Sequence, residues 1–288
     1  MHSLREIRRR IRSVSSTAQI TRAMQMVAAS KMRKAQQAAL DGIPFVRLVY
    51  RIQREATHWA GPVPHPLLEV REVKTRAVIL VGADKGLCGA LNSNVCRVAA
   101  QFDPATTIFV AAGRRAAQFV ARTGRRLAAE FAYGDNPTVA DARAIAGFAR
   151  DLFLERKVDE VRLVATRFVN TLRQEPVSHE FLPVGRITGL DIPGAEPQQE
   201  LEHDDGGCLF EPSAAGVLAY LLSHYLNIYV HQVLLHAKAS EQSARMVSMK
   251  NATDSAEALI DDLRREYNTV RQGNITRELL EIAGGQSD

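Results

Sequence analysis

The residues that could do chemistry gather first in a glycine-rich turn at residues 82–89. The turn follows an apolar run at 77–81, typical of a strand buried on both faces, and precedes a helical stretch ending near Phe102. Many α/β proteins bind a dinucleotide or a phosphate at such a strand-to-helix turn. The glycines here do not give GxGxxG, however, and GxxxxGK[ST] occurs nowhere in the sequence. The turn is therefore predicted to be structural. The alternative interpretation, a nucleotide-using enzyme, is supported only by this turn.

The other reactive side chains lack the neighbours that catalysis or metal binding requires. Cys88 has no histidine near it in sequence, and a buried, inert cysteine is the common case. Three histidines fall in the helical segment 224–236 without an HExxH pattern. We therefore predict no catalytic residue, no metal site and no cofactor. The three cysteines form neither a CxxC pair nor a metal-ligand spacing, which suits a reducing compartment: Cys88, Cys96 and Cys208.

Two long helices are predicted at the ends of the chain, and they must position the functional side chains of the protein. In both, apolar residues recur at alternating spacings of three and four, which is typical of a coiled coil. Residues 41–44 (Asp-Gly-Ile-Pro) are predicted to break or kink the first helix, which resumes from Phe45 to about His58. The middle of the chain must return between the helices, so they are predicted to pair antiparallel. The methionines of the two helices, Met26 among them, are also expected to be residues of the core seam. The two seams are Leu4, Ile7, Ile11, Val14, Ala18, Thr21, Gln25, Ala28, Met32, Ala35 and Ala39, and Leu218, Leu221, Tyr225, Ile228, Gln232, Leu235, Ala239, Gln242, Met246, Met249, Thr253, Ala256, Ile260, Leu263, Tyr267 and Val270.

Between the helices the sequence alternates between strands and helices. Such alternation predicts an α/β domain of the doubly wound, Rossmann-like kind, with a mostly parallel sheet. Residues 185–211 are rich in proline, glycine and acids, and are predicted to form a loop or linker. The expected domains are residues 1–60 and 212–288 for the coiled-coil helices, and residues 61–211 for the α/β domain with its acidic linker. The expected strands are 77–81, 107–111, 161–166 and 176–184. Three helices are expected: one that ends near Phe102, one at 114–122 and one at 139–156.

Charge is distributed unevenly along the chain. Residues 1–40 carry nine arginines and lysines against one acid, whereas residues 195–211 carry six acids and no basic residue. The basic helix indicates either an acidic partner, such as nucleic acid, anionic lipid or an acidic protein loop, or simply a solvated face. No signal peptide is evident, and polar residues interrupt the richest apolar window, 217–237. We expect a soluble chain without a membrane span.

Three stretches of sequence carry a specific resemblance. The segment 7–36, IRRRIRSVSSTAQITRAMQMVAASKMRKAQ, resembles the opening helix of the gamma subunit of F-type ATP synthase. Residues 86–95, GLCGALNSNV, are similar to the central signature of that family. Residues 243–285, SARMVSMKNATDSAEALIDDLRREYNTVRQGNITRELLEIAGG, are similar to its C-terminal signature. The chain is identified as a member of this family on three motifs in the right order.

The resemblance implies a rotor that has no catalytic site of its own. In the family, the terminal helices form a coiled coil that threads a ring of alpha and beta subunits, and the α/β domain forms a foot. The foot meets the epsilon subunit and the ring of membrane c subunits, and catalysis belongs to beta. This implies a peripheral protein at the cytoplasmic face of a bacterial inner membrane. It implies neither nucleic-acid binding nor a required homo-oligomer, and the alternative is a basic coiled-coil nucleic-acid-binding protein with an α/β domain.

The resemblance also assigns roles to individual positions. It implies that the basic helix faces acidic loops of beta, and that the turn at Gly86, Leu87, Cys88, Gly89 and Asn92 is the signature of the foot. The stretch 208–212 stands where the family commonly has aromatics before an EP dipeptide, and Cys208 departs from that pattern. Positions matched to beta contacts are Met24, Arg245, Arg271, Gln272 and Thr276, and those matched to the foot and c-ring contact are Cys208 and Phe210.

Overall fold

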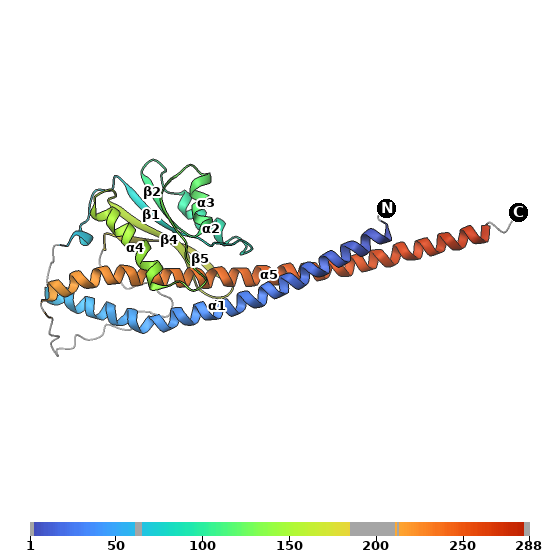
Figure 1. Ribbon diagram of the computed structural model, residues 1–288, viewed down its shortest axis with the longest axis horizontal. Helices are drawn as coiled ribbons and strands as arrows, with labels where there is room; N and C mark the ends of the chain where they lie inside the picture. The colour runs from blue at the N-terminus through green and yellow to red at the C-terminus, as the bar shows by residue number, and fades with distance from the viewer. Residues whose placement is uncertain (1–2, 61–64, 185–210, 212, 285–288) are drawn as a thin grey trace. The chain divides into compact units, whose positions relative to one another are not determined.

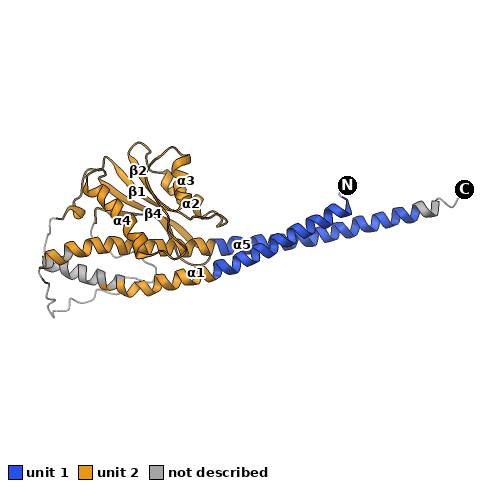
Figure 2. Cartoon of the chain, in the orientation of Figure 1, with its two compact units in different colours: residues 1–29, 245–288 blue, residues 30–244 orange. Residues whose placement is uncertain are grey.

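Two compact units make up the chain in a computed structural model that describes residues 3–60, 65–184, 211 and 213–284. The first unit comprises residues 1–29 and 245–288, and the second comprises residues 30–244 (Figure 2). Helix α1 (Leu4–Ala60) and helix α5 (Ala214–Gly284) each contribute a segment to both units (Figure 1). The two long terminal helices predicted from the apolar spacing are therefore confirmed.

Burial along both helices follows the predicted seams. Every described side chain of the seams that the spacing predicts is buried or half-buried, including the polar Thr21, Gln232 and Thr253. The predicted break at residues 41–44 is wrong, since α1 continues through Pro44. Proline in a helix costs about 3 kcal/mol, but the buried Ile43 beside it offsets this. Gly42 instead allows close approach, because a Cβ there would lie 2.1 Å from Nε2 of Gln232 on α5.

A five-stranded sheet of order β3-β2-β1-β4-β5 lies at the centre of the second unit. Its strands are β1 (Arg76–Val81), β2 (Thr107–Ala112), β3 (Arg126–Phe131), β4 (Glu160–Phe168) and β5 (Gln174–Leu182). All neighbours pair in parallel except β4 and β5, which are antiparallel. The mostly parallel sheet and four of its strands are confirmed. Strand β3 was not predicted, because this edge strand is largely exposed and lacks a long apolar run.

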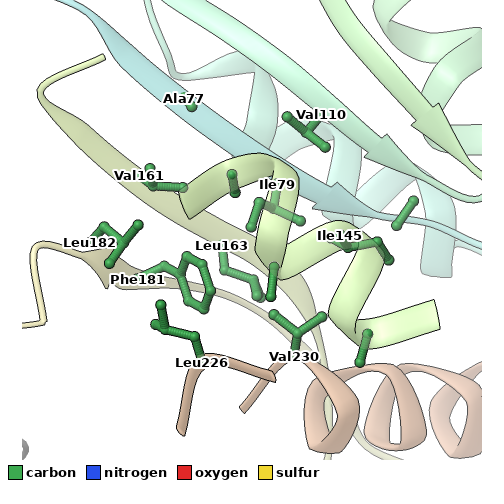
Figure 3. Close-up of a cluster of buried hydrophobic side chains, with 14 of the residues drawn as sticks. Ala77, Ile79, Val110, Ile145, Val161, Leu163, Phe181, Leu182, Leu226 and Val230 are labelled. Carbon is green, nitrogen blue, oxygen red and sulfur yellow. The ribbon is translucent and has the colours of Figure 1, made fainter. Parts of the chain in front are cut away.

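Helices cover both faces of the sheet. On one face, α2 (Leu91–Ala100) and α3 (Arg114–Arg122) enclose a core with Val78 and Leu80 of β1. On the other face, α4 (Val139–Leu154) and a segment of α5 pack on Ile79 and its neighbours, while η1 (Pro66–Leu68) adds Leu67. Figure 3 shows this second core, in which Leu226 and Val230 of α5 approach β4 and β5. The C-terminal helix thus completes the core of the α/β domain.

Candidate functional site: the paired helices and the signature turn

In the first unit, α1 and α5 pair antiparallel through contacts at several levels. The hydroxyls of Thr21 and Thr253 lie 2.7 Å apart in the buried seam. Nearer the N-terminus, Nη2 of Arg8 donates a 2.6 Å hydrogen bond to the hydroxyl of Tyr267, and its Cζ lies 5.5 Å from the centre of that ring. Arg22 also forms an ion pair with a glutamate of α5. These contacts match low residue numbers on α1 with high ones on α5, as the antiparallel prediction requires.

The outer surface of α1 carries apolar side chains outside the predicted seam, among them Met26, whose expected place in the seam is wrong. Ile20, Met26 and Val27 are all more than half exposed, and all three lie outside the seam of the first unit. Exposed apolar residues grouped on one element indicate a contact surface for a partner. The signal was present in the sequence, because these residues are apolar but do not follow the spacing of three and four. The seam predicted from that spacing therefore did not include them.

The C-terminal part of α5 is exposed on all sides. None of residues 271–280 is buried, so Arg271, Gln272 and Thr276 are all exposed. The hydroxyl of Thr276 donates a 3.0 Å hydrogen bond to the carbonyl of Gln272, which keeps that side chain along the helix. Three apolar side chains share this stretch, Ile275, Leu279 and Leu280, and Leu280 is 68% exposed. This part of the helix presents both polar and apolar groups to its surroundings.

Met24 and Arg245, the other two positions matched to beta contacts, lie closer to the seam. Met24 is half-buried, as is Met246 on the facing helix. Arg245 is buried, so its guanidinium is not a freely solvated charge. The structure brings these residues into the same unit as Arg271 and Thr276, along one pair of helices.

The signature turn is held together by contacts within the chain. Leu87 and Gly89 both have positive φ values, 63° and 57°, and the Leu87 side chain is 59% exposed. Asn92 on α2 accepts a 3.1 Å hydrogen bond from the Ala83 N–H and donates one of 3.2 Å to the sulfur of Cys88. These bonds use a backbone donor that a phosphate would need, and Cys88 is buried. The turn is therefore built as a packed corner that presents Leu87.

Two of the predicted contact positions, Cys208 and Phe210, lie outside the described residues. Within the described residues, no cluster of three or more histidine, cysteine, aspartate or glutamate side chains could hold a metal ion. Nor is any helix in the described part of the chain both long and apolar enough to cross a membrane.

Sequence comparison identifies the family. A family model described as ATP synthase matches residues 3–287. An ATP synthase gamma chain from Opitutus terrae is 43% identical over 296 residues, which covers 99% of this chain and 98% of the relative. Another from Methylacidiphilum infernorum is 40% identical over 293 residues, with 99% of each chain covered. The chain belongs to the family of ATP synthase gamma chains.

Solved structures share the fold. A chain in the cryo-EM structure of the Euglena gracilis mitochondrial ATP synthase, described as OSCP/F1/c-ring in rotational state 3, superposes with a TM-score of 0.67. It is 18% identical, and the match covers 99% of this chain and 93% of that one. A chain in the central stalk and c-ring structure of the Tetrahymena thermophila mitochondrial enzyme gives a TM-score of 0.60 at 24% identity, covering 81% and 99%.

Family membership confirms the resemblance drawn from the three motifs. The chain is a subunit of an enzyme complex, ATP synthase, and its role there is that of the rotor in the central stalk. The described geometry agrees with this family, because α1 and α5 pair antiparallel in the first unit and the second unit is an α/β domain packed on a segment of α5. The basic helix α1 is accordingly part of a rotor and not of a nucleic-acid-binding protein.

Proposed function

We propose that this chain is the shaft through which proton flow in a bacterial F-type ATP synthase drives ATP synthesis, and through which hydrolysis drives the reverse. Its helices, residues 1–60 and 212–288, thread the ring of alpha and beta subunits. Residues 61–211 form the foot, which meets the epsilon subunit and the c-subunit ring at the cytoplasmic face of the inner membrane. The chain itself supplies no catalytic side chain, and the reaction takes place at beta-subunit sites.

The observation that carries this proposal is the exposed C-terminal stretch of α5. Apolar side chains that are exposed to water become more stable when a partner covers them. Residues 271–280 carry such side chains beside polar ones, so this stretch fits a binding surface of partner subunits that is partly apolar and partly polar. Arg271 and Gln272 are adjacent on the helix and point about 100° apart. They reach different sides of such a surface.

A single asymmetric shaft inside a ring of identical beta subunits gives each beta a different contact at any moment. Contacts that differ between states are what shift a conformational equilibrium, so rotation of the shaft changes the state of each site in turn. Arg271 offers a fork of donors for a carboxylate or for carbonyls, and Gln272 offers both donor and acceptor. The excess of basic residues on α1 is complementary in charge to acidic loops of beta.

The test is a complex assembled with this chain carrying both Arg271→Ala and Gln272→Ala. Loss of a charge-assisted bond costs about 1.5–3 kcal/mol, so we expect ATP turnover to fall by about tenfold or more. Thermal unfolding of the chain should be unchanged, because both side chains are exposed. Turnover and ATP-driven proton pumping are measured in reconstituted vesicles.

The matched control is Arg143→Ala, which removes an exposed arginine from α4 of the α/β domain and should leave turnover unchanged. Normal turnover and pumping in an assembled double variant would show that these two residues do not carry the contact. Failure of the unaltered chain to assemble with alpha and beta subunits would refute the proposed function itself.

A further inference from the structure

A network of charged side chains joins the α/β domain to both long helices within the second unit. Its centre is Asp135, in the segment between β3 and α4. One carboxylate oxygen accepts a 2.5 Å hydrogen bond from Nζ of Lys31 on α1, and the other lies 3.8 Å from Nζ of Lys238 on α5. One aspartate of the domain is thus shared by two lysines, one from each helix.

Lys238 is an unusual residue for this position because it is only 1% exposed. Its ammonium donates a 3.0 Å hydrogen bond to Glu241, which is 2% exposed, and lies 4.8 Å from the centre of the Tyr133 ring. An ammonium is costly to bury unless it is paired and hydrogen-bonded. The two carboxylates and the ring face meet that need, so Lys238 is held in one position and not merely packed.

The same network reaches the central strands of the sheet. Tyr133 is buried, and its hydroxyl donates a 2.9 Å hydrogen bond to the carbonyl of Gly82, at the end of β1. Burial raises the pKa of Tyr133 well above its ordinary value, and the negative charge of Glu241 adds to this. The hydrogen bond from Lys31 is the main cause that lowers the pKa of Asp135, so the aspartate is charged at neutral pH.

The remaining contacts between α5 and the sheet are mainly apolar. Leu222, Leu226, Val230 and Leu234 pack on the core of the sheet, and such burial is favourable but not directional. Directional links are fewer. Besides Asp135, His231 Nε2 hydrogen-bonds to the Pro137 carbonyl at 3.1 Å, the Ser243 hydroxyl donates to the Thr171 carbonyl at 2.7 Å, and Nε2 of Gln174 on β5 donates to the Ser243 hydroxyl at 3.4 Å.

We propose that Asp135 is a positioning residue of the rotor, which fixes the α/β domain in one orientation on α1 and α5 so that torque passes between domain and helices. This rests on the proposed function of the chain as a rotor. The two lysines face the aspartate from two helices, so a slide or turn of α1 breaks a charge-assisted hydrogen bond, and one of α5 draws an ammonium away from its carboxylate. Apolar packing alone permits such small slips.

The expected size of the effect follows from these four directional links of the described residues. Charge-assisted bonds are about twice as strong as neutral ones. The Asp135 link therefore supplies about two-fifths of the directional stiffness, and its loss should raise the angular variance between domain and ring about 1.7-fold. A half-exposed ion pair contributes little to folding stability, so the effect should appear in stiffness and not in thermal unfolding.

The experiment uses the assembled catalytic sector, with the ring fixed to a surface and stalled by a non-hydrolysable nucleotide. A bead is attached through exposed positions of α3, and its thermal angular variance is recorded. Asp135→Asn should raise this variance about 1.7-fold, whereas Asp135→Glu should restore it. The matched control is Asp151→Asn, since Asp151 pairs only with its neighbour Arg150 among the ion pairs of the described residues.

Lys31→Met tests the same link from α1 and should raise the variance by less, because Lys238 still binds the aspartate. If Asp135→Asn does not assemble, the angular variance of Lys31→Met tests the proposal in its place. A variance equal to that of the unaltered chain in Asp135→Asn, or in Lys31→Met when only that variant assembles, overturns the inference while leaving the rotor function intact. An unaltered chain whose bead does not turn on addition of ATP refutes the rotor function and the inference together.

Discussion

His236 on α5 makes the stability of the second unit depend on pH. Burial, and then the nearby positive charge of Arg167, lower the pKa of His236 from 6.5 to about 4. Neither ring nitrogen has a hydrogen-bond partner among the described residues. The folded chain therefore holds this imidazole neutral, and we expect His236→Phe to remove a pH dependence that the unaltered chain shows.

The direction of the change in unfolding free energy with pH follows from the pH at which each state binds the proton. The unfolded chain protonates His236 as the pH falls through about 6.5, while the folded chain does so only near pH 4. Between these values the unfolded state binds more protons, so the free energy of unfolding falls as the pH falls. The loss reaches about 2 kcal/mol at pH 5 and about 3 kcal/mol when the titration is complete.

The assay is urea unfolding at a series of pH values from 7.5 to 5, followed by circular dichroism. The comparison of His236→Phe with the unaltered chain cancels other groups, including His65, whose pKa burial also lowers. The variant should lose about 2 kcal/mol less than the unaltered chain over this range. At pH 7.5 it should be as stable or more so, because an unsatisfied buried polar group costs about 1–3 kcal/mol.

Two chains with the same slope against pH would refute this account of His236.

Two further substitutions test the elements around the site. Thr253→Val removes one hydroxyl of the buried pair with Thr21, and we expect a loss of about 0.5–1.5 kcal/mol in the free energy of unfolding, measured with denaturant; an unchanged midpoint would mean that the pair adds nothing to the seam. Thr138→Ala removes the capping box at the start of α4, in which Asp141 is the reciprocal partner, and should lower stability by about 1 kcal/mol. A thermal midpoint equal to that of the unaltered chain would contradict that role.

The seams could be predicted because spacing decides which face of a helix is covered. Spacing does not decide which residue lies opposite which, so the meeting of Thr21 with Thr253 needed the structure. The same limit applies to the sheet. Its strands were visible as apolar runs, but β3 was not, because an exposed edge strand has no such run. Tertiary packing also overrode the local signal at Pro44, where burial of Ile43 keeps the helix continuous.

The contact surfaces were predicted unevenly for a similar reason. Arg271, Gln272 and Thr276 came from the resemblance, and they stand exposed where a partner can reach them. Asp135 and Lys238 gave no signal, because they meet only when α5 crosses the end of the sheet, more than a hundred residues further along the chain. A lysine beside a predicted seam normally faces solvent, and only the packed sheet turns this one into a buried group.

The covering of the sheet by α5 also decides when the chain can fold during its synthesis. Leu222, Leu226 and Val230 complete one core of the domain, yet they are made after all five strands. Until the ribosome has released them, Leu163, Phe181 and their neighbours lack the part of their cover that α5 provides, and of the described elements only α4 and η1 pack on that face. The nascent chain therefore carries an open apolar surface for about 40 residues of translation, or roughly 2–8 s at bacterial rates. The topology thus delays completion of this core until the first turns of the C-terminal helix have been made.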